Sequence, residues 1–214
     1  MDPHSLIDIS IPLKKSMIHY PGDTPFHSEK DAEISDKCAY NLSKIHMSVH
    51  SGTHIDFPRH FIKNGLMSQD FSVDRFHIPI CVIEISNEES IQRKAIENLD
   101  DSECQGILFK TRNSRKNLLL REEFYETYTY LSEEAAEFCV KKKFQLLGID
   151  YLSIEQFGNI AFPIHKLLLK ANILILEGIN LHEVKPGKYW LSCFPLALEN
   201  VEAAPVRAIL FPRE

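Results

Sequence analysis

The sequence predicts an α/β fold: a single domain, residues 1–214, with a mixed, barrel-like β-sheet flanked by helices. Strand-like and helix-like segments alternate through residues 80–177, which is typical of a mainly parallel, buried sheet. The first third of the chain carries short strand-like runs instead, which favours a mixed sheet or partial barrel over a plain doubly wound one. The length of 214 residues and a hydrophobic content of 44% fit one globular domain.

Strands are expected in both halves of the chain. In the first third they fall at residues 6–11 and 45–50, and a turn-rich segment, Tyr-Pro-Gly-Asp-Thr-Pro at 20–25, lies between them. Beyond Pro79 the apolar runs become longer and more continuous, as in buried strands. The further expected strands are residues 80–85, 106–109, 144–149, 172–176 and 206–211.

Helices are expected between these strands, at residues 88–99, 133–143 and 163–170. The first has apolar residues on one face. Ser132 can cap the second, which begins with two glutamates and ends with three lysines, an order that suits the helix dipole. Pro163 can open the third, because proline is tolerated at a first helical position. The polar stretch 112–116 is expected to be a loop.

Composition excludes several classes of protein. The net charge of -6, from 24 Lys+Arg and 30 Asp+Glu, argues against a nucleic-acid partner. Uncharged apolar runs fall short of the roughly 18 residues that a membrane span requires. The first twenty residues lack the apolar core of a signal peptide, so a soluble, cytoplasmic protein is expected. Five scattered cysteines without a C-x-x-C pair favour reduced thiols over a disulfide scaffold or zinc ribbon.

The histidines carry the first chemical signal, since glycine-rich nucleotide motifs and the G-x-S-x-G of serine hydrolases are absent. Imidazole and carboxylate groups suit zinc and related transition metals. His50, His54, Asp56 and His60 lie at even spacing, so in an extended segment they point to one side, and Gly52 lets the backbone bend so that they converge. The pattern therefore predicts a metal site with open coordination positions.

The alternative for this segment is a strand edge with exposed polar residues. A lone His-x-x-x-His pair fits that alternative, whereas four aligned groups with a glycine between the first two favour a site. His46 continues the even spacing but precedes the glycine, so a structural or supporting role is preferred for it.

Two carboxylates, Asp150 and Glu177, follow apolar strands, at the sheet edge where α/β folds collect ligands. Glu177 closes a strand otherwise too apolar to hold a charge cheaply, so it needs a cation. His165 lies near a predicted helix start. By themselves, a capping role for His165 and a paired edge role for Glu177 remain open.

The motif His-Ser-Gly-Thr-His-x-Asp-x-Pro-x-His-Phe at residues 50–61 resembles the signature of the cyclase-like metal-dependent hydrolases, whose best-known members are bacterial kynurenine formamidases. The likeness covers nearly the whole chain. It includes residues 8–10, 20–25, 147–150 and 204–208, and His165 with Glu177 and Gly178.

The resemblance implies a site for one or two divalent ions, zinc most of all or manganese. Its implied ligands are His50, His54 and Asp56 for one ion, with Asp56 bridging to a second position completed by His165 and Glu177. His60 would donate and accept the proton. The family fold is an α/β domain with a barrel-like mixed sheet, assembled as a homodimer or higher homo-oligomer.

Two departures from the formamidase pattern fall on the substrate side. Tyr20 stands where formamidases typically carry a tryptophan of the aromatic substrate pocket, and Tyr-Leu-Ser at 151–153 replaces Thr-Pro-Ser. Tyr20 is therefore expected to bind substrate, the alternative being that it only packs the turn at Pro21 and Gly22.

The function that the resemblance implies is metal-dependent hydrolysis of a small amide, with N-formyl-L-kynurenine as leading substrate and kynurenine and formate as products. One alternative keeps the metal site but takes a cyclic amide such as isatin, or another acyl compound. A more distant one is a non-catalytic metal-binding protein, against which the presence of His60 argues.

Overall fold

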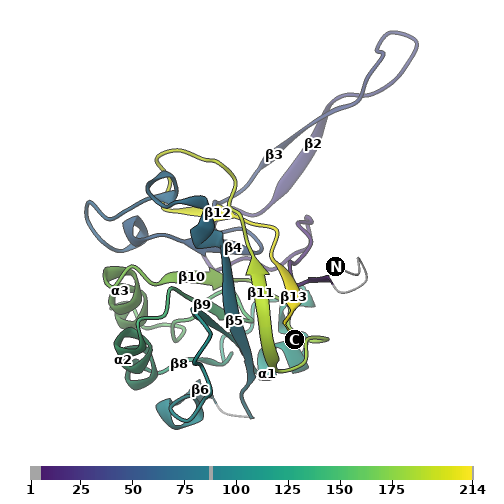
Figure 1. The fold of residues 1–214 in the computed structure, drawn as a ribbon. Helices are drawn as coiled ribbons and strands as arrows, with labels where there is room; N and C mark the ends of the chain where they lie inside the picture. Colours follow the sequence, from purple (N-terminus) through teal and green to yellow (C-terminus); the bar gives the residue numbers. More distant parts are fainter. Residues whose placement is uncertain (1–5, 87–88, 214) are drawn as a thin grey trace.

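The computed structural model describes residues 6–86 and 89–213, and its centre is a nine-stranded mixed sheet in the order β1-β13-β11-β5-β7-β9-β10-β4-β12 (Figure 1). The strands of this sheet are β1 (Ile7–Asp8), β4 (His54–Asp56), β5 (His77–Glu84), β7 (Gly106–Lys110), β9 (Leu146–Ile149), β10 (Leu174–Glu177), β11 (Gly187–Ser192), β12 (Ala203–Pro205) and β13 (Ile209–Pro212). The helices are α1 (Arg112–Arg115), α2 (Glu133–Lys142) and α3 (Pro163–Lys170).

The four central strands, β5, β7, β9 and β10, run parallel, as the alternation of strands and helices predicts. Antiparallel strands flank them, with β11 on one side and β4 on the other. The sheet is therefore mixed and curls into a half-barrel, which confirms the predicted fold class. Parallel strands align their carboxyl ends at one edge, and β9 and β10 therefore deliver residues 150–155 and Glu177 to neighbouring places.

Two apolar cores cover the two faces of the sheet, because side chains alternate along each strand. On one face Ile107, Leu147 and Ile175 pack under α2 and α3. On the other, Leu108 and Leu176 lie inside the curl of the sheet. Burial of both faces explains why the central strands are continuous apolar runs.

The prediction of a helix over residues 88–99 is wrong. Residue 88 lies outside the described residues, and the rest of the segment forms a short strand, β6 (Ser90–Ile91), and a single 3-10 turn (Arg93–Ala95). β6 pairs with β8 (Tyr130–Leu131) in a small parallel sheet. Tertiary pairing overrides the helical spacing, although Ile91 and Ile96 are both buried.

The polar stretch 112–116 forms helix α1 instead of the expected loop. The Thr111 side chain caps this helix by accepting the Asn113 N–H. The Asp150 carboxylate accepts the N–H groups of Thr111 and Ser114. The Asp150 contacts come from a distant strand end, so the local sequence does not reveal them.

The outer strands begin and end at positions that differ from the expected ones. Within residues 6–11, Ile7–Asp8 form β1 and Ser10 makes an isolated bridge with Ile179. The strand expected at 45–50 is β3 (Leu42–His46). Of the last expected strand, residues 206–211, only 209–211 are in a strand, β13, and β12 ends just before residue 206.

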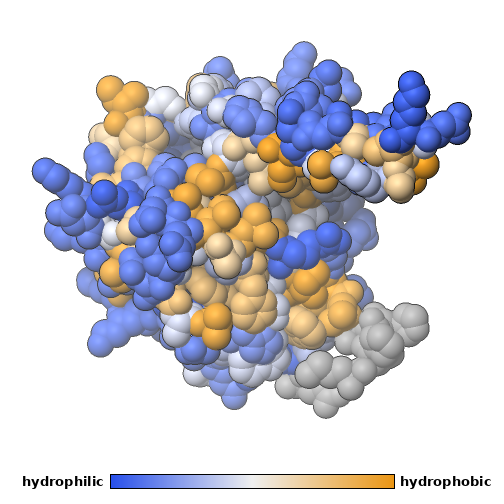
Figure 2. Space-filling model, turned by 90° about the horizontal axis from the view of Figure 1, so that it is seen from above, coloured by the Kyte–Doolittle hydropathy of each residue, from blue (hydrophilic) through white to orange (hydrophobic). Residues whose placement is uncertain are grey.

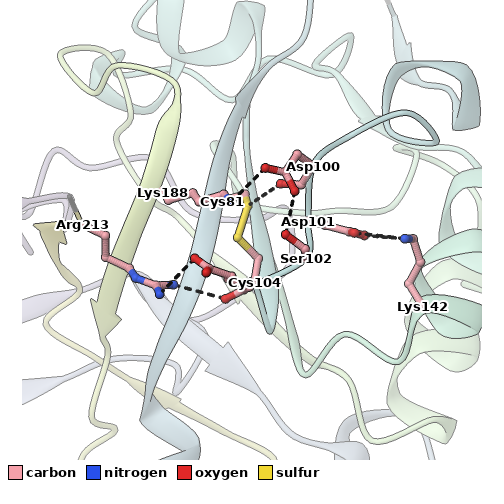
Figure 3. Close-up of a disulfide and its surroundings, with 9 residues drawn as sticks. Cys81, Asp100, Asp101, Ser102, Cys104, Lys142, Lys188 and Arg213 are labelled. Atoms are coloured by element: carbon pink, nitrogen blue, oxygen red, sulfur yellow. Dashed lines mark hydrogen bonds and ion pairs between the residues drawn. A yellow bond between two sulfur atoms is a disulfide. The ribbon is translucent and has the colours of Figure 1, made fainter.

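Cys81 and Cys104 form a disulfide between β5 and the loop before β7, so the expectation that all five thiols are reduced is wrong (Figure 3). Ion pairs surround the bond: Lys188 contacts Asp100, and Lys142 contacts Asp101. Cys38, Cys139 and Cys193 are free thiols. None of the helices in the described part of the chain has the length and apolar character needed to cross a membrane.

A long hairpin of β2 (His27–Ala32) and β3 projects from the body of the molecule (Figure 1). We call residues 27–46 the arm. Nearly all of its residues are exposed on both faces. Its large apolar side chains are among them: Ile34 is 62% exposed, Tyr40 60%, Leu42 50% and Ile45 58%. Figure 2 shows hydrophobic side chains along the arm beside hydrophilic ones.

Candidate active site

Strand β4 is the centre of the candidate site. It lies between β10 and β12, and His54 is the direct cross-strand partner of Glu177. His54 and Asp56 alternate with Ile55, so they share one face of the strand while Ile55 enters the core. All three β4 residues are buried, and the expected even-spacing geometry is present for His54 and Asp56.

Two glycines allow β4 to approach the end of β10. Gly52 has φ +68 and Gly178 has φ +68, a conformation that favours glycine. A Cβ on Gly178 would lie 2.1 Å from the Gly52 carbonyl oxygen, so no side chain fits there. The bend expected at Gly52 is therefore present, and Thr53 closes the junction by donating its hydroxyl to the Gly178 carbonyl, 2.6 Å away.

His50 and His60 reach the site from outside the strand. His50 ends the turn that follows β3, and His60 ends a 3-10 turn that begins at Pro58. Their ring centroids are 4.3 Å apart. The Nδ1 of His50 lies 2.9 Å from Oδ1 of Asp56. The four groups of the 50–60 motif thus converge, as the sequence predicts.

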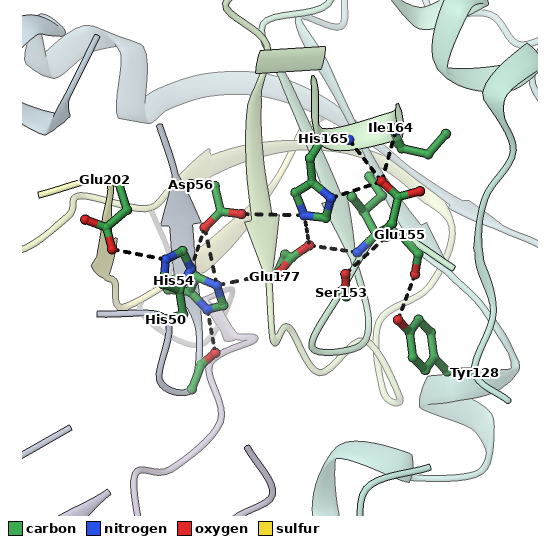
Figure 4. A network of polar contacts seen from close by, with 12 residues as sticks. His50, His54, Asp56, Tyr128, Ser153, Glu155, Ile164, His165, Glu177 and Glu202 are labelled. Carbon is green, nitrogen blue, oxygen red and sulfur yellow. Dashed lines mark hydrogen bonds and ion pairs between the residues drawn. The ribbon is translucent and has the colours of Figure 1, made fainter. Parts of the chain in front are cut away.

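His165 and Glu177 face this cluster from α3 and β10 (Figure 4). The Nε2 of His165 lies 3.4 Å from Oε1 of Glu177 and 3.8 Å from Oδ2 of Asp56. The same Glu177 oxygen accepts the Ile154 N–H at 2.7 Å. Five side chains from three elements and two turns therefore meet around Asp56.

The donor set fits a divalent metal ion. His54 Nε2 and Asp56 Oδ2 are buried, and no described residue offers either atom a hydrogen bond. His54 Nε2 lies 3.5 Å from Asp56 Oδ1 and 3.6 Å from Glu177 Oε2. Two ligands about 2.1 Å from a tetrahedral ion are about 3.4 Å apart, so these spacings suit atoms that share one ion.

Two groups of donors in the described chain have the spacing to hold an ion, and both contain Asp56. One group is His54, Asp56 and Glu177, and the other is His50, Asp56 and His60. Asp56 is the residue that both groups share. The resemblance groups His54 with His50 and Glu177 with His165, whereas these two groups place His54 with Glu177 and His60 with His50.

Burial and the neighbouring carboxylates shift the pKa values of the site histidines in opposite directions. Burial lowers the pKa of His54 to about 4. Burial also opposes charge on His50, but Asp56 outweighs it and raises the pKa of His50 to about 10. For His165 burial again opposes charge, and hydrogen bonds to Glu155 and Glu177 raise its pKa to about 9. Burial lowers the pKa of His60. Burial raises the pKa of Glu177.

A cavity of about 380 Å³ opens onto these residues. Its polar wall contains His50, His54, His60, His165, Glu177 and Asp23. Its apolar wall contains Tyr20, Phe61, Leu152 and Phe162. Tyr20 therefore lines the cavity as expected, and its ring also meets the edges of Phe124 and Phe157.

Two residues noted in the sequence lie away from the site. His46 is exposed at the base of the arm and pairs with His27, so it does not support the cluster. Asp150 is buried, and its carboxylate holds the start of α1, accepting the Thr111 hydroxyl at 2.7 Å. Its position at a strand end serves structure instead of ligand binding.

Two acidic residues of the site were not expected from the sequence. Glu155 accepts N–H groups of α3 and contacts the His165 ring. Glu202 lies 3.5 Å from His50 Nε2, next to β12. Glu155 follows a buried strand in an otherwise apolar segment, which is the only local signal; for Glu202 the sequence offers none.

Comparison with known proteins gives consistent results. The sequence profile of the Cyclase family matches residues 7–156. A Bacillus cereus protein named kynurenine formamidase is 36% identical over 206 residues, which is 96% of this chain and 97% of the relative. The relative of the same name from Bacillus anthracis is 34% identical over the same lengths.

Solved structures share the fold. A "predicted metal-dependent hydrolase" from Bacillus stearothermophilus superposes with a TM-score of 0.82 at 29% identity, covering 97% of this chain and 98% of the other. Isatin hydrolase A from Ralstonia solanacearum has a TM-score of 0.81 at 20% identity, covering 97% and 92%, a likeness of fold alone. The family profile and the relatives at this identity lead to one conclusion: the chain belongs to the Cyclase family.

Proposed function

We propose that the protein is a metal-dependent hydrolase of small amides and that it converts N-formyl-L-kynurenine to kynurenine and formate. The observation that carries this proposal is the convergence of three histidines and two carboxylates beside a cavity, with His54 Nε2 and Asp56 Oδ2 buried and without a hydrogen bond from any described residue. The relatives named kynurenine formamidase support the choice of substrate.

The proposed ligands are His50, His54, Asp56, His165 and Glu177, with zinc or manganese as the ion and one or two ions per chain. A divalent ion in such a site lowers the pKa of water and polarises a carbonyl, which is the chemistry that amide hydrolysis at neutral pH requires.

The chain positions its own groups for the remaining steps. The Gly52 carbonyl oxygen lies 3.0 Å from Nδ1 of His54 and fixes that ring, so its Nε2 faces the cluster. His60 takes the proton of the attacking water and passes it to the departing aromatic amine. Burial lowers the pKa of His60, so the ring is neutral at neutral pH and able to accept a proton.

The apolar wall suits an aromatic substrate. Tyr20, Phe61 and Phe162 can flank an aniline ring, since aromatic pairs gain stability beyond the area they bury. Tyr20 occupies the place in the sequence where the formamidases typically have an indole, and we assign it the same contact. A cyclic aromatic amide such as isatin meets the same wall, so it is the main competitor in any substrate test.

A substrate panel on metal-defined protein tests the proposal. The protein is stripped with a chelator, reloaded with zinc or manganese, and given N-formyl-L-kynurenine, isatin and an aliphatic formamide. We expect turnover only after reloading, with the highest kcat/KM on N-formyl-L-kynurenine. Full activity in metal-free protein would overturn the mechanism. Preference for isatin would keep the mechanism and replace the substrate.

We also propose that the chain works as a homodimer in which the arm contacts the second copy. A two-stranded hairpin exposed on both faces is marginally stable alone. The side chains of Leu42 and Ile45 are 50% and 58% exposed. Contact with a second copy removes this apolar surface from water. In the sequence, the arm lies between the cavity-lining turn at Tyr20–Asp23 and His50. Contacts of the arm with a second copy therefore affect the position of these cavity residues.

A further inference from the structure

We infer that Glu155 is the positioning residue that fixes the orientation of His165 and thereby sets the metal affinity of the site. The inference rests on the proposed metal site but not on the identity of the substrate. Glu155 is only 1% exposed, and its carboxylate lies behind His165, on the side of the ring away from Asp56 and Glu177 (Figure 4).

Glu155 makes two kinds of contact through one oxygen. Oε2 accepts the backbone N–H groups of Ile164 at 3.0 Å and of His165 at 3.3 Å. The same oxygen lies 3.3 Å from Nδ1 of the His165 ring. The first two contacts cap helix α3, whose residue before Pro163 is Phe162, a side chain with no capping atom.

The third contact determines what the imidazole presents to the cluster. A carboxylate oxygen accepts the Nδ1 proton, so the lone pair of the neutral ring is on Nε2. Nε2 is the atom that lies 3.4 Å from Glu177 Oε1 and 3.8 Å from Asp56 Oδ2. A carboxylate on the far side of a ligating imidazole both fixes its tautomer and makes it a stronger donor.

The peptide around Glu155 couples both ends of the site. The N–H of Ile154 holds Glu177 Oε1, and the next residue holds His165. Tyr128 fixes this segment, because its hydroxyl donates a hydrogen bond to the Glu155 carbonyl oxygen, 2.7 Å away. Residues 154 and 155 therefore set the spacing between two proposed ligands that belong to different elements.

The test separates the capping contact from the contact to the ring. In Glu155→Gln the amide oxygen can still accept the two backbone N–H groups, but the negative charge facing His165 is lost. We expect zinc affinity, measured by competition with a chromophoric chelator, to fall about 10- to 100-fold. The melting temperature of the metal-free protein should change little. In ¹⁵N-histidine spectra of the zinc-loaded protein, the His165 Nδ1 proton should move upfield.

Tyr128→Phe is the matched control, because it loosens the same segment and leaves the carboxylate in place. We expect it to lower the melting temperature and to reduce zinc affinity far less than Glu155→Gln does, because the carboxylate still faces His165. Wild-type zinc affinity in Glu155→Gln would overturn the inference and leave Glu155 as a helix cap. If the wild-type chain binds neither zinc nor manganese, the proposed metal site is wrong and this inference falls with it.

Discussion

At the scale of single residues, Asp56 is the group around which the site is organised. It is fully buried, and its two oxygens face three histidines: His50 at 2.9 Å, His54 at 3.5 Å and His165 at 3.8 Å. Burial raises the pKa of its carboxyl, but His50 and His60 more than compensate and hold it far below the usual range. Asp56 is therefore an anion at all physiological pH values, ready to bind a cation.

Substitutions at His60 and His54 should distinguish a loss of proton transfer from a loss of metal binding. His60→Ala should lower kcat about 100- to 10,000-fold, the usual contribution of a general acid–base group, while zinc content stays near wild type. His54→Ala should lose both activity and zinc. Paired kinetics and elemental analysis decide the matter. Because His60 also lies in a donor group with His50 and Asp56, equal loss of metal in both variants would make His60 a ligand.

Metal binding should release protons at neutral pH. In the metal-free protein the pKa values of His50 and His165 are raised to about 10 and about 9, so both rings are cationic imidazolium groups at pH 7.5. Ligation requires neutral imidazole, and apparent zinc affinity should therefore rise as pH increases toward 9. Calorimetry in two buffers of different ionisation enthalpy should report up to two protons released. A binding enthalpy independent of buffer would contradict the assignment of both rings as ligands.

Tyr20→Ala should weaken substrate binding more than it weakens the fold. Tyr20 lines the cavity and is only half-buried, so loss of its ring removes contact with an aromatic substrate. We expect KM for N-formyl-L-kynurenine to rise several-fold, with a small change in melting temperature. Unchanged KM together with a clear loss of stability would instead show that Tyr20 only packs against Phe124 and Phe157.

The site residues differ in how far the sequence could predict them. The spacing from His50 to His60 is local, and alternation along the strand correctly places His54 and Asp56 on one face. The bend at Gly52 brings in His50, whereas the 3-10 turn that carries His60 is not part of the expected extended segment. For His165 and Glu177 the residues alone left other roles open, because the approach of Glu177 depends on the pairing of β10 with β4 and that of His165 on the packing of α3. Glu155 and Glu202 reach the cluster through packing between distant elements. The apolar segment after a buried strand is the only local signal for Glu155, and for Glu202 the sequence offers none.

At the scale of elements, local signals predict α2 and α3 well. Ser132 accepts the Ala135 N–H, and Lys143 ends α2 in a left-handed conformation. Both features arise from neighbouring residues. The failed helix at 88–99 shows the limit of such signals, since the pairing of β6 with β8 stabilises a different structure for the same apolar spacing.

The Cys81–Cys104 disulfide joins two elements and should stabilise the fold without serving the site. It closes a loop of 23 residues, for which chain entropy predicts about 3 kcal/mol. Cys104 precedes β7, at the edge of the parallel strands opposite the one that bears Glu177. Cys81→Ser/Cys104→Ser should therefore lower the melting temperature by roughly 6–12 °C and leave kcat/KM unchanged. Reductant should destabilise wild type but not the double variant; equal melting curves would show that the bond contributes nothing.

At the scale of the whole molecule, the curled sheet follows from the sequence but the arm does not. Apolar runs over residues 80–177 are continuous because the parallel strands are buried on both faces. This pattern can be recognised in the sequence. In the arm, charged and apolar residues mix: Lys44 pairs with Glu29 while its neighbour Ile45 is exposed. Such a segment has no buried face within its own chain, so periodicity cannot reveal it.

The arm should determine the assembly of the protein. Leu42→Ser/Ile45→Ser removes two exposed apolar side chains, so the folded monomer should lose little stability. If the arm covers a second copy, light scattering should report about twice 24.7 kDa for wild type and about 24.7 kDa for the double variant. Ile160→Ser is the matched control, since Ile160 is 87% exposed outside the arm, and it should stay dimeric. A wild-type monomer, or a double variant that remains dimeric, would show that the arm does not form the interface.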